Sequence, residues 1–101
     1  MADDFFAPPA FEPQDALVQL KRALRELRPL AERSNCFEIK AQTVILLAVN
    51  DAHIDAHIDA QLARRPARSP SWDRFTLASS ADQRRFIDEV KKRLASWAHD
   101  E

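Results

Sequence analysis

Glycine is absent from this chain of 101 residues, although average usage would place roughly seven in a protein of that length. Glycine lets the backbone take positive φ and lets a ligand approach the chain closely. Its absence excludes the Walker loop, the dinucleotide-binding fingerprint and the nucleophile elbow, which need glycines at fixed positions. It also removes the preferred residue of tight primed hairpins, and this disfavours an all-β fold.

Cysteines and long hydrophobic runs are scarce as well. Cys36 is the single cysteine, so no disulfide can form within the chain, and we expect a reducing, cytoplasmic location. The longest uncharged apolar stretch, residues 41–49, is far shorter than the ~20 residues needed to span a bilayer. Asp3 and Asp4 stand where a secretory signal carries basic residues, so neither export nor a membrane partner is predicted.

The charges nearly cancel. Fifteen basic residues stand against 16 acidic ones, for a net charge of -1, so the chain has no global basic field to attract nucleic acid. A bias toward alanine and arginine suits the GC-rich genome of a bacterium. No cofactor motif is present, and the lone cysteine and scattered serines show no base or oxyanion site beside them, so we expect a protein that is not an enzyme.

Two segments have the periodicity of amphipathic helices. Residues 13–28 begin with Pro13, which suits the first helical turn, and end before Pro29. A last helix starts at Ser80, with Gln83 completing a capping box. Both segments carry apolar residues at 3-4-3 spacing, namely Leu17, Leu20, Leu24 and Leu27 in the first and Ile87, Val90, Leu94 and Trp97 in the second.

The middle segment, residues 37–65, shows two apolar faces at 100° per residue and is predicted to be one long helix, broken near Asn50-Asp51 or paired with a second chain. The predicted fold is therefore all-α: a bundle of three main helices within a single domain, residues 13–99, preceded by an extended arm, residues 1–12. The weaker alternative is an α+β fold with a short hairpin at residues 37–47, because β-branched residues cluster there.

The arm combines carboxylates with aromatic rings, as a docking peptide does. Phe5, Phe6 and Phe11 are the candidate partner-binding residues, beside Asp3 and Asp4. The alternative, which is the commoner arrangement, is that these rings cover the chain's own domain.

The tandem repeat HIDA-HIDA, residues 53–60, attracts attention because His53 and His57 have the i,i+4 spacing of metal ligands on a helix. The general-base glutamate and a third ligand are missing, so no metal site is predicted. On the same predicted helix, three aspartates recur at four-residue spacing, and their mutual repulsion indicates a positively charged counterpart. The alternative is that the aspartates and the basic residues are both solvated. The first helix offers such a counterpart, so the complementary stripes are Asp51, Asp55 and Asp59 and Lys21, Arg25 and Arg28.

The segment after the repeat, residues 66–79, is predicted to be a connector, with arginines gathered around Trp72. Arg64, Arg65 and Arg68 are candidate nucleic-acid contacts, since arginines near an aromatic ring can bind phosphate and stack on bases. Arginines that follow a helix also favour its negative end, which is the plainer explanation of the cluster.

The sequence as a whole favours a small bacterial cytoplasmic adaptor or regulator that binds another protein and forms a homodimer through its long middle helix. The alternative function is a nucleic-acid-associated regulator that uses the arginine-rich connector and the basic stripe of the first helix.

Overall fold

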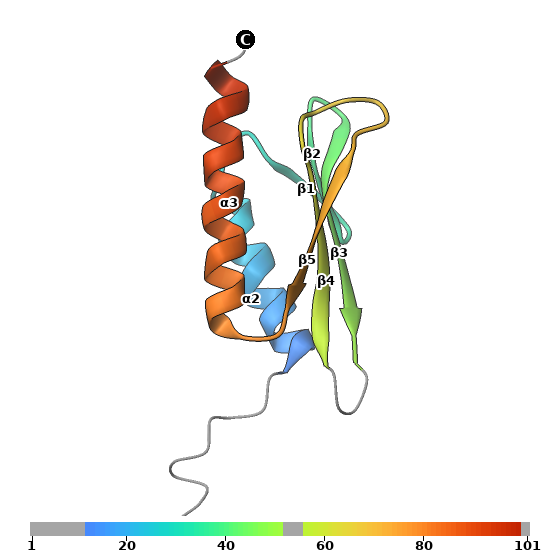
Figure 1. The fold of residues 1–101 in the computed structure, drawn as a ribbon, viewed down its shortest axis with the longest axis vertical. Coiled ribbons are helices and arrows are strands. Elements are labelled where there is room, and N and C mark those ends of the chain that lie inside the picture. The colour runs from blue at the N-terminus through green and yellow to red at the C-terminus, as the bar shows by residue number, and fades with distance from the viewer. Residues whose placement is uncertain (1–11, 52–55, 100–101) are drawn as a thin grey trace, which may run out of the picture.

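In the part of the chain that the structure describes, two helices and five strands make up the fold (Figure 1). The computed structural model describes residues 12–51 and 56–99. The elements in chain order are α2 (Pro13–Arg25), β1 (Ala31–Arg33), β2 (Cys36–Ile39), β3 (Gln42–Asn50), β4 (His57–Ala63), β5 (Trp72–Leu77) and α3 (Ser80–His99). Each strand pairs antiparallel with the next along the chain, so the sheet order is β1-β2-β3-β4-β5.

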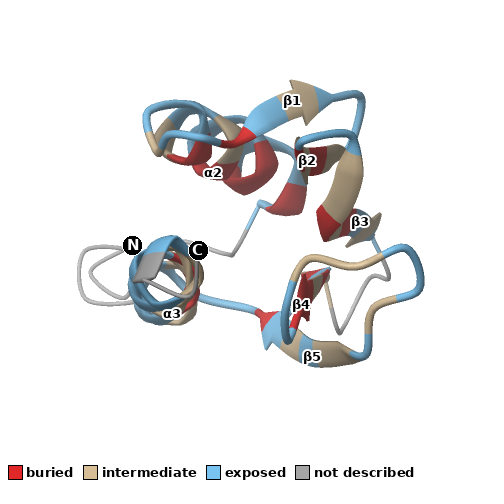
Figure 2. Ribbon diagram, turned by 90° about the horizontal axis from the view of Figure 1, so that it is seen from above, coloured by how far each residue is buried: buried red, intermediate tan, exposed pale blue. Residues whose placement is uncertain are grey.

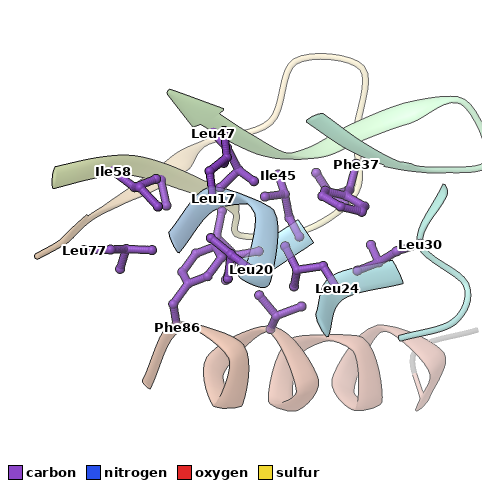
Figure 3. Packing of buried hydrophobic residues seen from close by; sticks show 14 of the residues in the cluster. Leu17, Leu20, Leu24, Leu30, Phe37, Ile45, Leu47, Ile58, Leu77 and Phe86 are labelled. Atoms are coloured by element: carbon purple, nitrogen blue, oxygen red, sulfur yellow. The ribbon is translucent and has the colours of Figure 1, made fainter. Parts of the chain in front are cut away.

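One face of this sheet carries the core. Residues at every second position of β3 and β4 point to the same face, where Ile45 pairs with Leu62 and Leu47 with Ala60. Both helices lie on that face (Figures 1 and 2). The leucine stripe of α2 and the buried face of α3 complete the core, in which Leu17, Leu20 and Phe86 lie close together (Figure 3). The result is a two-layer α+β sandwich.

The prediction of an all-α bundle of three main helices is wrong. The two outer helices are present, but residues 37–65, predicted to be the long middle helix, form β2, β3 and β4 instead. The helix face through which a dimer was expected therefore does not exist. The weaker alternative, an α+β fold with a hairpin at 37–47, is closer, because β2 and β3 are two of the five strands.

The four-residue repeat explains much of this error. A period of four is close to the helical period of 3.6 and is also an even multiple of the strand period of two. In β4 the strand period prevails: Ile58 and Ala60 are buried, whereas Asp59 between them is exposed. The segment predicted to be a connector also holds a strand, β5, whose Leu77 is buried in the core.

The hairpins form without glycine. Ser34 lies at positive φ in the turn between β1 and β2, and both Lys40 (φ 49°) and Ala41 (φ 68°) do so between β2 and β3. Two consecutive residues at positive φ are typical of a type I′ turn, where asparagine and glycine are the usual choices. The absence of glycine therefore does not prevent these hairpins, because pairing and core burial outweigh a local cost of about 1–2 kcal/mol per left-handed residue.

The helix boundaries agree with the sequence more closely. The helix predicted at 13–28 starts at Pro13 and ends at Arg25, four residues before Pro29. The last helix starts at Ser80 as predicted, but its cap lies one residue earlier. The Asp82 amide donates to Ser79 Oγ (3.1 Å), and the Asp82 carboxylate accepts from the Ala78 amide (2.9 Å). Ser79 and Asp82 therefore cap this end of α3, in place of the predicted capping box of Ser80 and Gln83.

Candidate functional site: a groove at one end of the sandwich

Four segments that are distant in the sequence meet at one end of the sandwich. They are the chain just after α2, the β2–β3 turn, the connector between β4 and β5, and the last turns of α3. Figure 1 shows this end at the top, opposite the end at which α2 and α3 begin. Two cavities open here, and we call them together the end groove.

The first cavity has a volume of about 480 Å³, which is within the usual range for a ligand pocket. Apolar side chains from the different segments form most of its wall, and three polar residues complete it. Its lining residues are Pro29, Ile39, Pro66, Leu94, Trp97 and Ala98, with Lys40, Gln42 and Arg65.

The second cavity, of about 490 Å³, lies on the other side of Gln42, which lines both. The connector passes along both cavities, with residues 65–66 in the first and 67–70 in the second. The second cavity is lined by Ala41, Gln42, Thr43, Ala67, Arg68, Ser69, Pro70 and Trp72. Each cavity therefore contains one tryptophan, and Trp72 and Trp97 are the two tryptophans of the chain.

The end groove is positively charged. Lys40 and Arg65 line the first cavity and Arg68 lines the second. Within the described part of the chain, the residues lining the two cavities include no acidic side chain. A groove with tryptophans, aliphatic walls and cationic side chains favours a ligand that is both apolar and negatively charged.

A network of charges holds the wall of the end groove in place. Arg93 of α3 donates from Nη2 to Asp73 Oδ2 (2.8 Å), from Nε to Glu89 Oε2 (2.9 Å) and from Nη1 to the Ala63 carbonyl oxygen (3.2 Å). Arg64 also donates a hydrogen bond from its Nε to Asp73 Oδ1 (3.0 Å). These hydrogen bonds, first from Arg64 and then from Arg93, hold the pKa of the Asp73 carboxyl below its ordinary value.

The indole of Trp97 is fixed one helical turn further along. Its Nε1–H donates to the carbonyl oxygen of Arg64 (3.2 Å), where the connector leaves β4. The ring is therefore oriented before any ligand binds, which lowers the entropy that binding would cost.

The arginines predicted to contact nucleic acid separate into two kinds. Arg64 is paired with Asp73, whereas Arg65 and Arg68 are exposed and line the two cavities. The remaining lining residues were not identified as a site by sequence reasoning, which placed Trp97 in the seam of a helical bundle. The only signal available was the gathering of arginines around Trp72.

The structure gives the predicted basic stripe a different partner. Lys21 and Arg25 contact the carboxylate of Glu32 on β1, with Lys21 Nζ 3.9 Å from Glu32 Oε2 and Arg25 Nη2 3.3 Å from the same oxygen. The hydrogen bond from Arg25 lowers the pKa of Glu32 and raises that of Arg25 itself. Asp51 is exposed after the end of β3, Asp59 is exposed on β4, and Arg28 is exposed beyond the end of α2.

Several candidate residues lie outside the described part of the chain, namely Phe5, Phe6, Phe11, His53 and Asp55. Of the two candidate metal ligands, His57 is described, and its Nε2 lies 3.1 Å from Asp59 Oδ1. A search of the described residues finds no group of three or more His, Cys, Asp or Glu side chains arranged to hold a metal ion.

Comparison with known proteins adds no family to this geometry. No protein-family model, curated protein or solved structure matches the chain. Within residues 12–51 and 56–99, neither helix combines the length and the apolar character needed to cross a bilayer.

Proposed function

We propose that the protein is a small, non-enzymatic interaction module that binds a short acidic and aromatic segment of another polypeptide in its end groove. The observation that carries this proposal is the pair of cavities that share Gln42, each with a tryptophan and at least one cationic side chain. A bacterial adaptor or regulator in the cytoplasm is the role we infer, and the single cysteine, Cys36, which is free of a disulfide, suits that compartment.

A peptide fits this arrangement better than a single small molecule does. Two cavities on either side of one residue can each take a side chain of an extended chain, while the backbone passes over Gln42. Aromatic anchors in pockets dominate the affinity of protein interfaces, and carboxylates beside them would meet Lys40, Arg65 and Arg68.

The alternative of a nucleic-acid partner has weaker support. Arg64 and Arg93, the two arginines at the same end that could add positive charge, are already paired with Asp73 and Glu89. The aliphatic wall formed by Ile39 and Leu94 offers no hydrogen bonds to the edges of bases, and the chain as a whole carries a net charge of -1.

Tryptophan fluorescence tests the proposal, because both tryptophans line the end groove. The probe is a synthetic peptide with two adjacent aromatic residues flanked by glutamates, and its control carries lysines in place of the glutamates. We expect the acidic peptide to change the emission in a saturable, salt-sensitive manner and the lysine peptide to have no effect. The variants W72F and W97F then show which cavity responds.

Charge reversal supplies the matched control. The double variant R65E/R68E should bind the acidic peptide at least about tenfold more weakly. R22E/R84E reverses two exposed arginines outside the groove and should bind as the natural chain does. No response to the acidic peptide would overturn the proposal. A response to a single-stranded oligonucleotide in its place would favour the nucleic-acid alternative.

A further inference from the structure

We propose that the acidic, aromatic segment around Phe5 and Phe6 of one copy of this chain docks in the end groove of a second copy, and that two copies exchange these segments to form a dimer. This inference rests on the proposed function, because it names the peptide that the groove binds. The chemistry of the segment, the length of the chain and the position of the groove support it.

The chemistry of the segment matches that of the groove. Asp3 and Asp4 directly precede Phe5 and Phe6 in the sequence. The two adjacent rings correspond to the two cavities that share Gln42, and the two carboxylates correspond to the cationic side chains of Lys40, Arg65 and Arg68. Arg65 and Arg68 are exposed and therefore accessible to a second molecule.

The length of the chain favours a second copy over the same copy. The described chain begins at Glu12, at the end of the sandwich opposite the groove (Figure 1). Phe5 lies seven residues before Glu12, a span of at most about 25 Å for a fully extended backbone and about 22 Å in the polyproline conformation that Pro8-Pro9 favours.

The distance to be covered is about as long as that span. From Ser80, at the end where α2 also begins, α3 rises about 21 Å to Leu94 at the near edge of the groove and about 26 Å to Trp97. Phe5 and Phe6 could therefore reach the groove of their own chain only with the intervening backbone fully extended along the molecule, whereas a second copy can present its groove without that constraint.

A mutual exchange of segments also limits the assembly to two copies. Each copy contributes one segment and one groove, so two copies satisfy both without leaving an unfilled site that would recruit a third. Prolines between the rings and the helix limit the freedom that docking would remove.

Sedimentation velocity of the full chain over a range of concentrations tests the inference. The natural chain should pass from a monomer of 11.6 kDa to a dimer as its concentration rises. The variant F5A/F6A should dimerise about 30-fold more weakly or worse, since it lacks both anchors. The groove variant R65E/R68E should lose the dimer likewise, while R22E/R84E should retain it.

Mixing the defective variants gives the sharpest test. F5A/F6A has an intact groove and R65E/R68E has an intact segment, so the mixture should form a heterodimer although neither variant dimerises alone. A natural chain that stays monomeric, a dimer that survives F5A/F6A, or a mixture that stays monomeric would overturn the inference.

The acidic synthetic peptide separates this outcome from the proposed function. One outcome is that the peptide still changes the tryptophan emission of F5A/F6A while the natural chain is monomeric. In that case the groove binds peptides but does not bind the Phe5-Phe6 segment of a second copy. If neither protein responds to the peptide, the proposed function itself is wrong.

Discussion

Arg93 and Asp73 join the last helix to the last strand through a contact of 2.8 Å between Nη2 and Oδ2. Asp73 lies on the helix-facing side of β5, because it pairs with the inward-facing Leu62 of β4. The same guanidinium reaches the carbonyl oxygens of Leu62 and Ala63, so one side chain fastens α3 to two strands. Trp97, one turn further along α3, depends on this attachment for its place in the end groove.

The pairs made by Asp73 and Glu32 predict how stability depends on pH. Both carboxyls have a lower pKa in the folded chain than in the unfolded one, so their stabilisation is complete above the unfolded values of about 3.9 and 4.3. It is lost as the pH falls through the folded values. We therefore expect the melting temperature to fall as the pH drops below about 4.

The variant D73N assigns part of that drop to Asp73. It should melt below the natural chain at pH 7, whereas the two should converge near pH 2, where the natural carboxyl is protonated as well. Circular dichroism melts at both pH values provide the measurement, with D88N, an exposed position of α3, as the control. A difference of the same size at both pH values would contradict the role given to Asp73.

Replacing Ala41 by glycine should stabilise the protein. Ala41 lies at φ 68°, where a side chain costs about 1 kcal/mol that glycine does not incur. Against this, glycine adds freedom to the unfolded chain, so we expect a net gain of up to about 1 kcal/mol, or a rise of roughly 4–8 °C per kcal/mol in melting temperature.

Ala48 offers the matched control for this substitution. It is an exposed residue in the interior of β3, where glycine should destabilise by about 0.5–1 kcal/mol. If A41G melts below the natural chain, as A48G should, the left-handed turn between β2 and β3 is incorrect.

The two adjacent serines at the start of α3 have different roles, because only Ser79 caps the helix. Ser79 Oγ accepts the amide of Asp82, so S79A should lower the free energy of unfolding by about 1 kcal/mol. S80A, inside the helix, should change it by less than about 0.5 kcal/mol. Urea unfolding of the two variants settles which serine is the cap, and a larger loss in S80A would contradict the structure.

The sequence predicted the helices better than the strands for a physical reason. Residues 13–25 and 80–99 combine several turns of 3.6-residue periodicity with clear start signals at Pro13 and Ser79-Ser80. The strands are short, and the four-residue repeat in β4 agrees with either period. Partner strands such as β3 decide between them, and that pairing is a non-local property that one segment does not reveal.

The end groove was only partly predictable for the same reason. Arg65 and Arg68 stood out because they are close to Trp72 in the sequence. Lys40 and Gln42 join them only because the β2–β3 hairpin forms, and Trp97 only because α3 packs back along the sheet. Neither the hairpin nor the packing of α3 against a sheet could be predicted while the middle segment was interpreted as a helix.

The most direct test of the peptide-binding groove is a titration followed by the indole resonances of the two tryptophans in a ¹H–¹⁵N NMR spectrum. The acidic, aromatic peptide should shift the Nε1–H signals of both Trp72 and Trp97, while the amide of Val18, exposed on α2 and outside the groove, should stay in place. Indole signals that remain fixed as the peptide saturates, or shifts centred on Val18, would contradict the account.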